Sequence, residues 1–240
     1  MEIDHWAKLL DLEEAYRDKE FLNKFGRPFA VFRPLFYLLI TALSKIIFNA
    51  KIFGIENIPQ KSPYIIAATH CSAADYPLIA WAMPKSARDN MYTITTAYFY
   101  DNPFARAFIF FAANSVRIDT VKDFTPALRA SARILAHGRS LYINPEGTWS
   151  EDGKLLPFKA GAGLLSFELK VPIVPVYIGG TFEMLPPHAL FIKKHGRVTI
   201  AFGEPIDPKR YKTEEERYYT YKKITDDLRE RIIGLKERYE

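Results

Sequence analysis

Residues 64–75 read YIIAATHCSAAD, and this stretch decides the fold of the chain around it. The apolar run Tyr64–Ala68 follows a proline, which predicts a buried strand. Apolar residues at helical spacing over 75–83 predict a helix soon afterwards. His70 therefore stands where a strand ends and a loop or helix begins, a usual place for catalytic side chains on a rigid scaffold.

His70 and Asp75 form a candidate acid–base pair. The carboxylate follows the imidazole by five residues, so it is close enough in sequence to fold back and hold one ring nitrogen. The other nitrogen is then available to take a proton from a hydroxyl group. Because no serine or cysteine stands in an elbow motif, the pair favours a general base that acts on a bound alcohol. A histidine that a carboxylate holds for structural reasons alone is the competing interpretation.

Strands and helices alternate along the rest of the chain. We expect strands within 51–59, 64–68, 91–96, 115–119, 140–143, 171–178 and 197–202. We expect helices within 4–25, 75–83, 98–113, 123–137, 160–168 and 213–239. This alternation predicts an α/β fold in which helices flank a mostly parallel or mixed central sheet.

The composition suits one α/β domain that meets a membrane surface. The chain has 240 residues, 48% of them hydrophobic, which is enough for a full core. A net charge of +5 accompanies 15% aromatic residues, and this combination fits an anionic membrane surface. Nucleic acid is not expected as a partner, because no compact basic run is present. The single cysteine, Cys71, excludes an internal disulfide, and we interpret it as a small packing residue.

The N-terminal part is predicted to associate with a membrane. Residues 4–25 are loosely amphipathic, and 29–48 form the most apolar stretch, with 11 uncharged residues between Arg33 and Lys45. A spanning helix needs about 20 mainly apolar residues. We therefore expect residues 1–48 to form two helices that lie in one leaflet, followed by a main domain over 49–240 with a C-terminal amphipathic helix. A single spanning helix and a helix hairpin packed on the domain are the alternatives.

Three further segments carry polar residues that chemistry could use. Arg117 lies within an apolar strand-like run, where a phosphate or carboxylate would be a good partner and an ion pair with Asp119 is the alternative. Glu146 follows a buried strand between proline and glycine, where it could bind a hydroxyl, orient the loop of His70, or form an ordinary turn. Lys159 precedes a glycine-rich helix start that could face an anion, although the spacing of a phosphate loop is missing.

The order and spacing of these segments resemble those of the glycerolipid acyltransferase family, whose best-known members are the 1-acylglycerol-3-phosphate acyltransferases. The resemblance covers roughly residues 50–205 and includes the Val-Pro-Ile-Val-Pro-Val run over 171–176. It implies that His70 is the general base and that Asp75 orients it. The residues that it implies for substrate binding are Ser72, Arg117, Glu146, Gly147, Thr148, Lys159, Gly161 and Pro175.

The resemblance also implies a function. A member of this family moves a fatty acyl group from an acyl-coenzyme A or acyl carrier protein thioester to a lipid hydroxyl, with no bound cofactor and no metal. The implied acceptor is 1-acyl-sn-glycerol 3-phosphate or another lysophospholipid. The implied location is the cytoplasmic face of a membrane, as a monotopic or peripheral protein.

Two departures from the family pattern leave the acceptor and the reaction open. Thr69 stands where the family usually has asparagine, and Trp149 stands where it usually has arginine. If that arginine helps to hold a phosphate, the acceptor could instead be a different lysolipid or a hydroxylated molecule without phosphate. A hydrolase, a transacylase and a non-catalytic lipid-binding protein at the membrane surface also fit the sequence.

Overall fold

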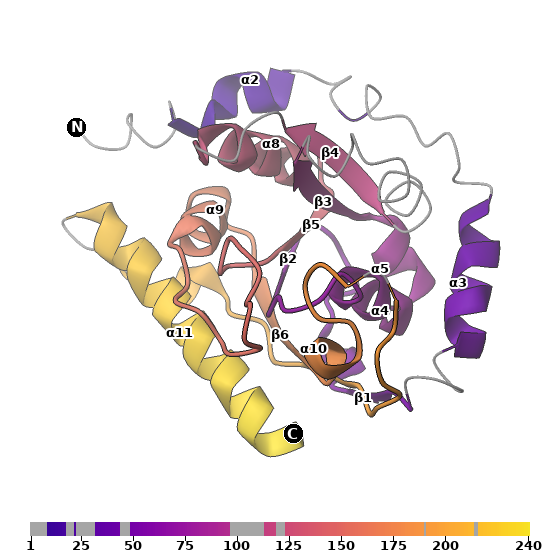
Figure 1. Ribbon diagram of the computed structural model, residues 1–240. Helices are drawn as coiled ribbons and strands as arrows, with labels where there is room; N and C mark the ends of the chain where they lie inside the picture. Colours follow the sequence, from indigo (N-terminus) through magenta and orange to yellow (C-terminus); the bar gives the residue numbers. More distant parts are fainter. Residues whose placement is uncertain are drawn as a thin grey trace.

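A seven-stranded sheet lies in the middle of the computed structural model, with helices on both sides (Figure 1). The structure describes residues 9–17, 22, 32–43, 49–96, 113–118, 123–189, 191–213 and 216–240. The strands are β1 (Lys51–Phe53), β2 (Ile65–Ala68), β3 (Met91–Thr96), β4 (Asn114–Ile118), β5 (Ser140–Ile143), β6 (Ile173–Gly179) and β7 (Thr199–Phe202).

The strand order is β1-β7-β6-β2-β5-β3-β4, and every pairing is parallel except that of β6 with β7. The predicted α/β class with a mostly parallel, mixed sheet is confirmed. Each predicted strand has a counterpart within a few residues of its expected bounds.

Helices of very different length cover the sheet. They are α2 (Leu12–Arg17), α3 (Arg33–Leu43), α4 (Asp75–Ala82), α5 (Lys85–Asp89), α8 (Thr125–Ala136), α9 (Gly161–Leu169), α10 (Thr181–Met184) and α11 (Arg217–Tyr239), with single 3-10 turns η4 (Ile55–Asn57) and η5 (Pro208–Arg210). The helix expected over 98–113 falls almost wholly outside the described residues, as does much of the one expected over 4–25.

Strand β2 explains how the two faces of the sheet are covered. Successive side chains of a strand point to opposite faces. Ile65 and Ala67 belong to a core that α8, α9 and α11 complete, whereas Ile66 and Ala68 belong to a core that α4 completes. All four side chains are fully buried, which is why the strand reads as an unbroken apolar run rather than an alternating one.

The two N-terminal helices lie on opposite faces of the sheet (Figure 1). Arg133 of α8 pairs with Glu14 of α2 at 2.7 Å. On the other face the indole Nε1 of Trp81 in α4 donates to the hydroxyl of Thr41 in α3 at 2.9 Å. Each of these two helices thus packs on the domain by one side. Among the described residues, no helix is both long and apolar enough to cross a membrane.

Two glycines of the α9–α11 region provide a matched test of this packing. A Cβ on Gly163 of α9 would stand 2.1 Å from the carbonyl oxygen of Tyr221 in α11, whereas a Cβ on Gly234 of α11 would meet nothing within 4 Å. We expect Gly163→Ala to lower the free energy of unfolding by about 1–3 kcal/mol or more, because backbone must move. Gly234→Ala should raise it by about 1 kcal/mol through helix propensity. Urea unfolding measures both, and equal midpoints would contradict the close approach.

Candidate active site

The carboxyl edge of the sheet brings three chain segments together. Because β2, β5 and β6 run parallel to one another, their carboxyl ends meet at the same edge. His70 follows β2, Glu146 follows β5 and Thr181 follows β6. The candidate site is built from these three segments.

His70 and Asp75 are in contact. Nδ1 of His70 lies 3.2 Å from Oδ2 of Asp75. When the carboxylate accepts the proton on Nδ1, Nε2 carries the lone pair that can take a proton. The His70 side chain is 18% exposed, whereas that of Asp75 is fully buried. The imidazole can therefore meet a substrate while its carboxylate partner stays away from water.

The buried Asp75 carboxylate is satisfied by backbone and hydroxyl donors. The N–H groups of Cys71 and Ser72 both donate to Oδ2 at 2.8 Å. The hydroxyl of Thr181 donates to Oδ1 at 2.6 Å. Asp75 is also the first residue of α4, and the N-terminal end of a helix favours negative charge. These contacts replace the water that burial removes and hold the carboxylate in one place.

Glu146 and Ser150 hold the backbone of His70 from two directions. Oε1 of Glu146 accepts the N–H of His70 at 3.0 Å, and Oε2 accepts the N–H of Leu156 at 2.8 Å. The N–H of Ser150 donates to the carbonyl oxygen of His70 at 2.9 Å. Burial raises the pKa of the Glu146 carboxyl, and the two N–H donors partly offset this effect. The geometry supports the orienting role for Glu146, rather than contact with a substrate hydroxyl.

Thr69 and Asn144 tie the end of β2 to both neighbouring strands. The Thr69 hydroxyl donates to the carbonyl oxygen of Ile178 and accepts its N–H, at 3.3 Å each. The Asn144 amide donates to the carbonyl oxygen of Ala68 at 3.0 Å. Thr69, the first departure from the family pattern, is therefore a link between strands that keeps the position of His70 constant.

Trp149, the second departure, lies against the ring of His70. The two ring centroids are 5.3 Å apart with an angle of 84° between the planes, an edge-to-face contact. The same indole lies 5.8 Å from the ring of His188, whose Nε2 is 3.4 Å from a carboxylate oxygen of Glu151. The position that normally carries arginine thus presents a neutral ring to the candidate base.

Lys159 lies beside the loop that holds His70. Its ammonium group stands 3.7 Å from the centroid of the Phe124 ring. A Cβ on Gly147 would come within 2.8 Å of Nζ, and Gly147 has φ of +73°, so both the space and the backbone require glycine there. Thr148 follows as an exposed residue. Lys159 therefore lies against the Gly147–Thr148 turn, directly after Glu146.

Of the other four predicted substrate-binding residues, Ser72 lies in the turn of the dyad, and the remaining three lie on β4, α9 and β6. Arg117 is exposed on β4, three strands from β2 and so about 14 Å away at normal strand spacing. Gly161 begins α9, and Pro175 is buried within β6. Ser72 is fully buried, and its hydroxyl accepts the N–H of Ala74 at 3.0 Å. Ser72 thus takes part in the turn after β2, and Pro175 takes part in the sheet.

Cys71 is a buried packing residue, as predicted. Its Sγ lies 3.4 Å from the Thr181 hydroxyl oxygen. Burial, and then the charge of Asp75, raise the pKa of the thiol to about 12. The thiol is therefore neutral at physiological pH and does not compete with His70 as a base or nucleophile.

Thr181, Asn144 and Ser150 complete the site, and no pattern in the sequence marks them as site residues. Thr181 follows Gly180, a residue with φ of +83° that stands between β6 and α10. A glycine pair after a buried apolar strand is the signal that could have indicated a turn into the site. Nothing in the sequence indicates its partner, because Thr181 and Asp75 are 106 residues apart.

A crevice of about 60 Å³ opens beside the dyad, between the Glu146 loop, α10 and the C-terminal half of α11. His70, Phe182 and Ile232 are among the residues that line it. This volume is far below the roughly 300–1,000 Å³ of ligand pockets, so the crevice does not hold an acyl chain as it stands. Within the described ranges, no three His, Cys, Asp or Glu side chains gather as metal ligands would.

Comparisons with known proteins agree on one family. A family model for acyltransferases matches residues 49–179. The chloroplastic 1-acyl-sn-glycerol-3-phosphate acyltransferase of Brassica napus is 27% identical over 168 residues, which cover 66% of this chain and 45% of that protein. The 1-acyl-sn-glycerol-3-phosphate acyltransferase of Saccharomyces cerevisiae is 31% identical over 147 residues, which cover 58% and 46%. The matched part spans about half the length of these curated relatives.

A solved structure is similar over most of its length. The crystal structure of the 1-acyl-sn-glycerophosphate acyltransferase PlsC from Thermotoga maritima superposes with a TM-score of 0.60 and 26% sequence identity. The similarity covers 95% of this chain and 89% of that one. The fold described above is therefore the fold of that enzyme.

The raised pKa of Glu146 predicts a pH-dependent contribution to stability. Between the ordinary carboxyl pKa of about 4.3 and the raised value, the folded state holds more protons than the unfolded state, so stability falls as pH rises. Glu146→Gln removes this titration. We expect the unfolding free energy of wild type, relative to Glu146→Gln, to decrease as the pH rises above the ordinary carboxyl pKa of about 4.3. Urea unfolding of both proteins at several pH values measures this difference in unfolding free energy. A difference that stays constant or rises with pH would contradict the raised pKa of Glu146.

Proposed function

This chain belongs to the acyltransferase family, because the family model matches more than half of it, and we propose that it transfers a fatty acyl group from an acyl thioester to a lipid hydroxyl. The acceptor that we propose is 1-acyl-sn-glycerol 3-phosphate. The similar proteins from Brassica napus, Saccharomyces cerevisiae and Thermotoga maritima carry that activity in their names.

The contact between His70 and the buried Asp75 is the observation that carries this proposal. The His70 imidazole is partly buried, and Asp75 holds it through Nδ1. Burial keeps the neighbouring thiol of Cys71 neutral, so this thiol is not available as a nucleophile. Such an arrangement suits direct attack by an acceptor hydroxyl. It does not suit an acyl-enzyme intermediate, which needs an activated nucleophile beside the base.

The proposed reaction has two steps. The acceptor oxygen attacks the carbonyl carbon of the thioester while its proton passes to Nε2 of His70, which produces a tetrahedral intermediate and an imidazolium. The carbon–sulfur bond then breaks, the carbonyl re-forms, and the leaving thiolate takes the proton from His70. The products are the ester and the free thiol, and His70 is neutral again. Asp75 stabilises the imidazolium between the steps.

The substrate-binding roles follow from the positions of the basic residues. Lys159 lies against the loop that follows Glu146, so we assign it to the acceptor phosphate, with Gly147 and Thr148 forming the adjacent surface; Lys154 and Lys236 are further cations on the crevice beside His70. Arg117 lies farther along the same edge of the sheet and is assigned to a more distant anionic group of either substrate. The donor is a coenzyme A or acyl carrier protein thioester, and no bound cofactor takes part in these steps.

A different lysolipid is the second candidate acceptor, and Trp149 is the residue that favours it. The indole lies on His70 where the family pattern places a cation. A neutral ring offers no ion pair to a phosphate, whereas it packs well against an uncharged or zwitterionic headgroup. Both candidates share the same base and the same thioester chemistry.

We also propose that the enzyme works at the cytoplasmic face of a membrane, as a monotopic or peripheral protein, with 1–48 as its membrane-associating segment and 49–240 as its acyltransferase domain. Helix α3 and Phe32, the residue before it, support this membrane association. The inner side of α3 packs on the domain. The outer side exposes large apolar residues, which are 53–65% exposed: Phe32, Leu35, Leu38 and Leu39. A row of exposed leucines suits the apolar region of one leaflet.

Replacement of His70 tests the function. We expect His70→Ala to lower kcat with acyl-coenzyme A and 1-acyl-sn-glycerol 3-phosphate by at least about 10³-fold, because the proton has no acceptor. His195→Ala, which changes an exposed histidine on another loop, is the matched control and should keep wild-type activity. Thiol release with a panel of lysolipid acceptors measures both variants. Substantial turnover by His70→Ala would contradict the role of His70 as general base. Release of free fatty acid without an acceptor would indicate a hydrolase instead.

Replacement of Leu38 tests the membrane surface. Leu38 is 65% exposed, so Leu38→Glu should fold normally. We expect its binding to phosphatidylcholine–phosphatidylglycerol vesicles to weaken at least tenfold, because burial of one leucine contributes about 2 kcal/mol. Tyr219→Glu, at an exposed position of α11, is the control and should bind as wild type does. Equal vesicle sedimentation of both variants would contradict the proposed surface.

A further inference from the structure

A pocket of about 650 Å³ lies at the edge of the sheet opposite the dyad. We call it the amino-edge pocket, because Tyr64, Asn90 and Arg139 line it and directly precede β2, β3 and β5. Tyr64 and His70 stand at the two ends of one strand, about 20 Å apart as extended chain. The pocket volume lies within the roughly 300–1,000 Å³ that is typical of small-molecule sites. A ligand here would not touch the catalytic dyad.

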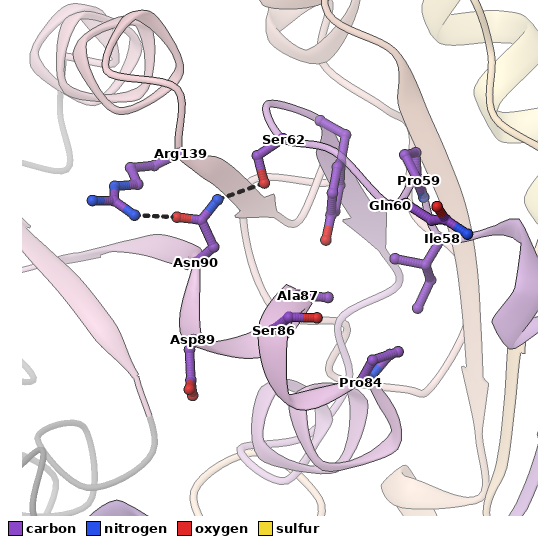
Figure 2. Close-up of a pocket in the computed structure, with 11 residues that line it drawn as sticks. Ile58, Pro59, Gln60, Ser62, Pro84, Ser86, Ala87, Asp89, Asn90 and Arg139 are labelled. Atoms are coloured by element: carbon purple, nitrogen blue, oxygen red, sulfur yellow. Dashed lines mark hydrogen bonds between the residues drawn. The ribbon is translucent and has the colours of Figure 1, made fainter.

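One wall of the pocket is a chain of hydrogen-bond donors. Figure 2 shows Asn90 between Arg139 and Ser62, with a dashed line to each. An Arg139 N–H donates to Oδ1 of Asn90, and the amide of Asn90 donates to the Ser62 hydroxyl at 2.5 Å. The Ser140 hydroxyl lies 3.0 Å from that of Ser62. These bonds hold the side chains of the wall in place.

The other side of the pocket is mainly apolar. Ile58 and Pro59 lie across from Asn90, Pro84 directly precedes α5, and Ala87 lies within it (Figure 2). Such a surface accepts the organic body of a ligand whose polar group faces the opposite wall.

The charge of the pocket favours an anion. Arg139 donates to a neutral amide, so its positive charge is not compensated by that partner. Asp89 is the carboxylate on the lining, and Lys85 pairs with it across one helical turn. The guanidinium keeps further N–H groups in a planar fork, the arrangement that matches phosphate oxygens.

A buried hydroxyl at the pocket points to the same chemistry. Tyr64 is 1% exposed, and its hydroxyl has no hydrogen-bond partner among the described residues. A buried hydroxyl without a partner is unfavourable, and a ligand oxygen that reaches it would supply the missing acceptor.

We propose that the amino-edge pocket binds a phosphate monoester, with the phosphate on Arg139 and the organic body against the apolar side. The site is separate from the dyad and its occupation needs no acyl transfer. Two sources carry this chemistry: a soluble phosphate ester, or the headgroup of an anionic lipid. The lipid is within reach because Arg88 of α5 lies 3.9 Å from the centroid of Tyr37, on the helix that exposes its leucines.

Binding measurements on the full chain test the proposal. The probes are sn-glycerol 3-phosphate in solution and phosphatidylcholine vesicles with and without phosphatidic acid. We expect saturable shifts of the backbone amide resonances of Ser62 and Asn90 with the soluble probe. Arg139→Gln should weaken this binding at least tenfold, and Arg139→Lys should weaken it less, because charge is kept and the fork is lost. A phosphatidic acid effect on vesicle binding that Arg139→Gln removes identifies the lipid source; its absence identifies the soluble one.

Two further variants keep the test decisive. Tyr64→Phe removes only the unpaired hydroxyl, so it should fold as wild type does and bind the soluble probe several-fold more weakly. His70→Ala should bind like wild type, which separates this site from the dyad. The proposal is overturned if neither probe binds saturably, if His70→Ala abolishes the binding, or if Arg139→Gln and Tyr64→Phe both bind like wild type. Loss of acyl transfer in His70→Ala with unchanged binding here supports both proposals independently.

Discussion

The full burial of the Asp75 carboxylate is the constraint on which the rest of the site depends. An ionised group away from water is costly unless donors surround it. Here the donors come from the backbone of Cys71 and Ser72 and from the hydroxyl of Thr181, so the turn after β2 and the start of α10 are both shaped around one carboxylate. His70 is what remains on the solvent side of that carboxylate. Its orientation is therefore set by a carboxylate that solvent does not reach.

The sequence predicts those parts of the fold and site that depend on local pattern. The apolar run before His70 indicates a buried strand, and five residues of spacing place Asp75 within reach. Glu146 is also recognisable, because a carboxylate between proline and glycine after a strand has few places to point. Thr181 is not recognisable, since its contact with Asp75 depends on β6 lying beside β2. Ser72 resembles a substrate contact in sequence, whereas its burial is decided by the tertiary packing.

The N-terminal helices show that a sequence pattern identifies a helix more readily than the surface that the helix contacts. An amphipathic or apolar helix is recognised by its side chains, but the surface that its apolar side meets is not. Glu14 of α2 and Thr41 of α3 contact opposite faces of the same domain. Both helices therefore contribute to the domain's own packing, while the outer side of α3, with residues such as Leu38, stays exposed and is available to a leaflet.

Trp149 contacts the ring of His70 but makes neither of the two hydrogen bonds by which Glu146 and Ser150 hold the His70 backbone. Glu146 and Ser150 hold the backbone of His70 through a carboxylate and an N–H group, and neither bond involves the side chain of residue 149. Residue 149 lies in the chain between Glu146 and Ser150, which both bond to the backbone of His70. The side chain at position 149 therefore lies next to the imidazole. A cation at 149 would add an ion pair for a phosphate, and the indole adds an apolar edge, without change to the hydrogen bonds that position His70. In the proposed function, the choice of acceptor therefore depends on a side chain that does not hold the base in place.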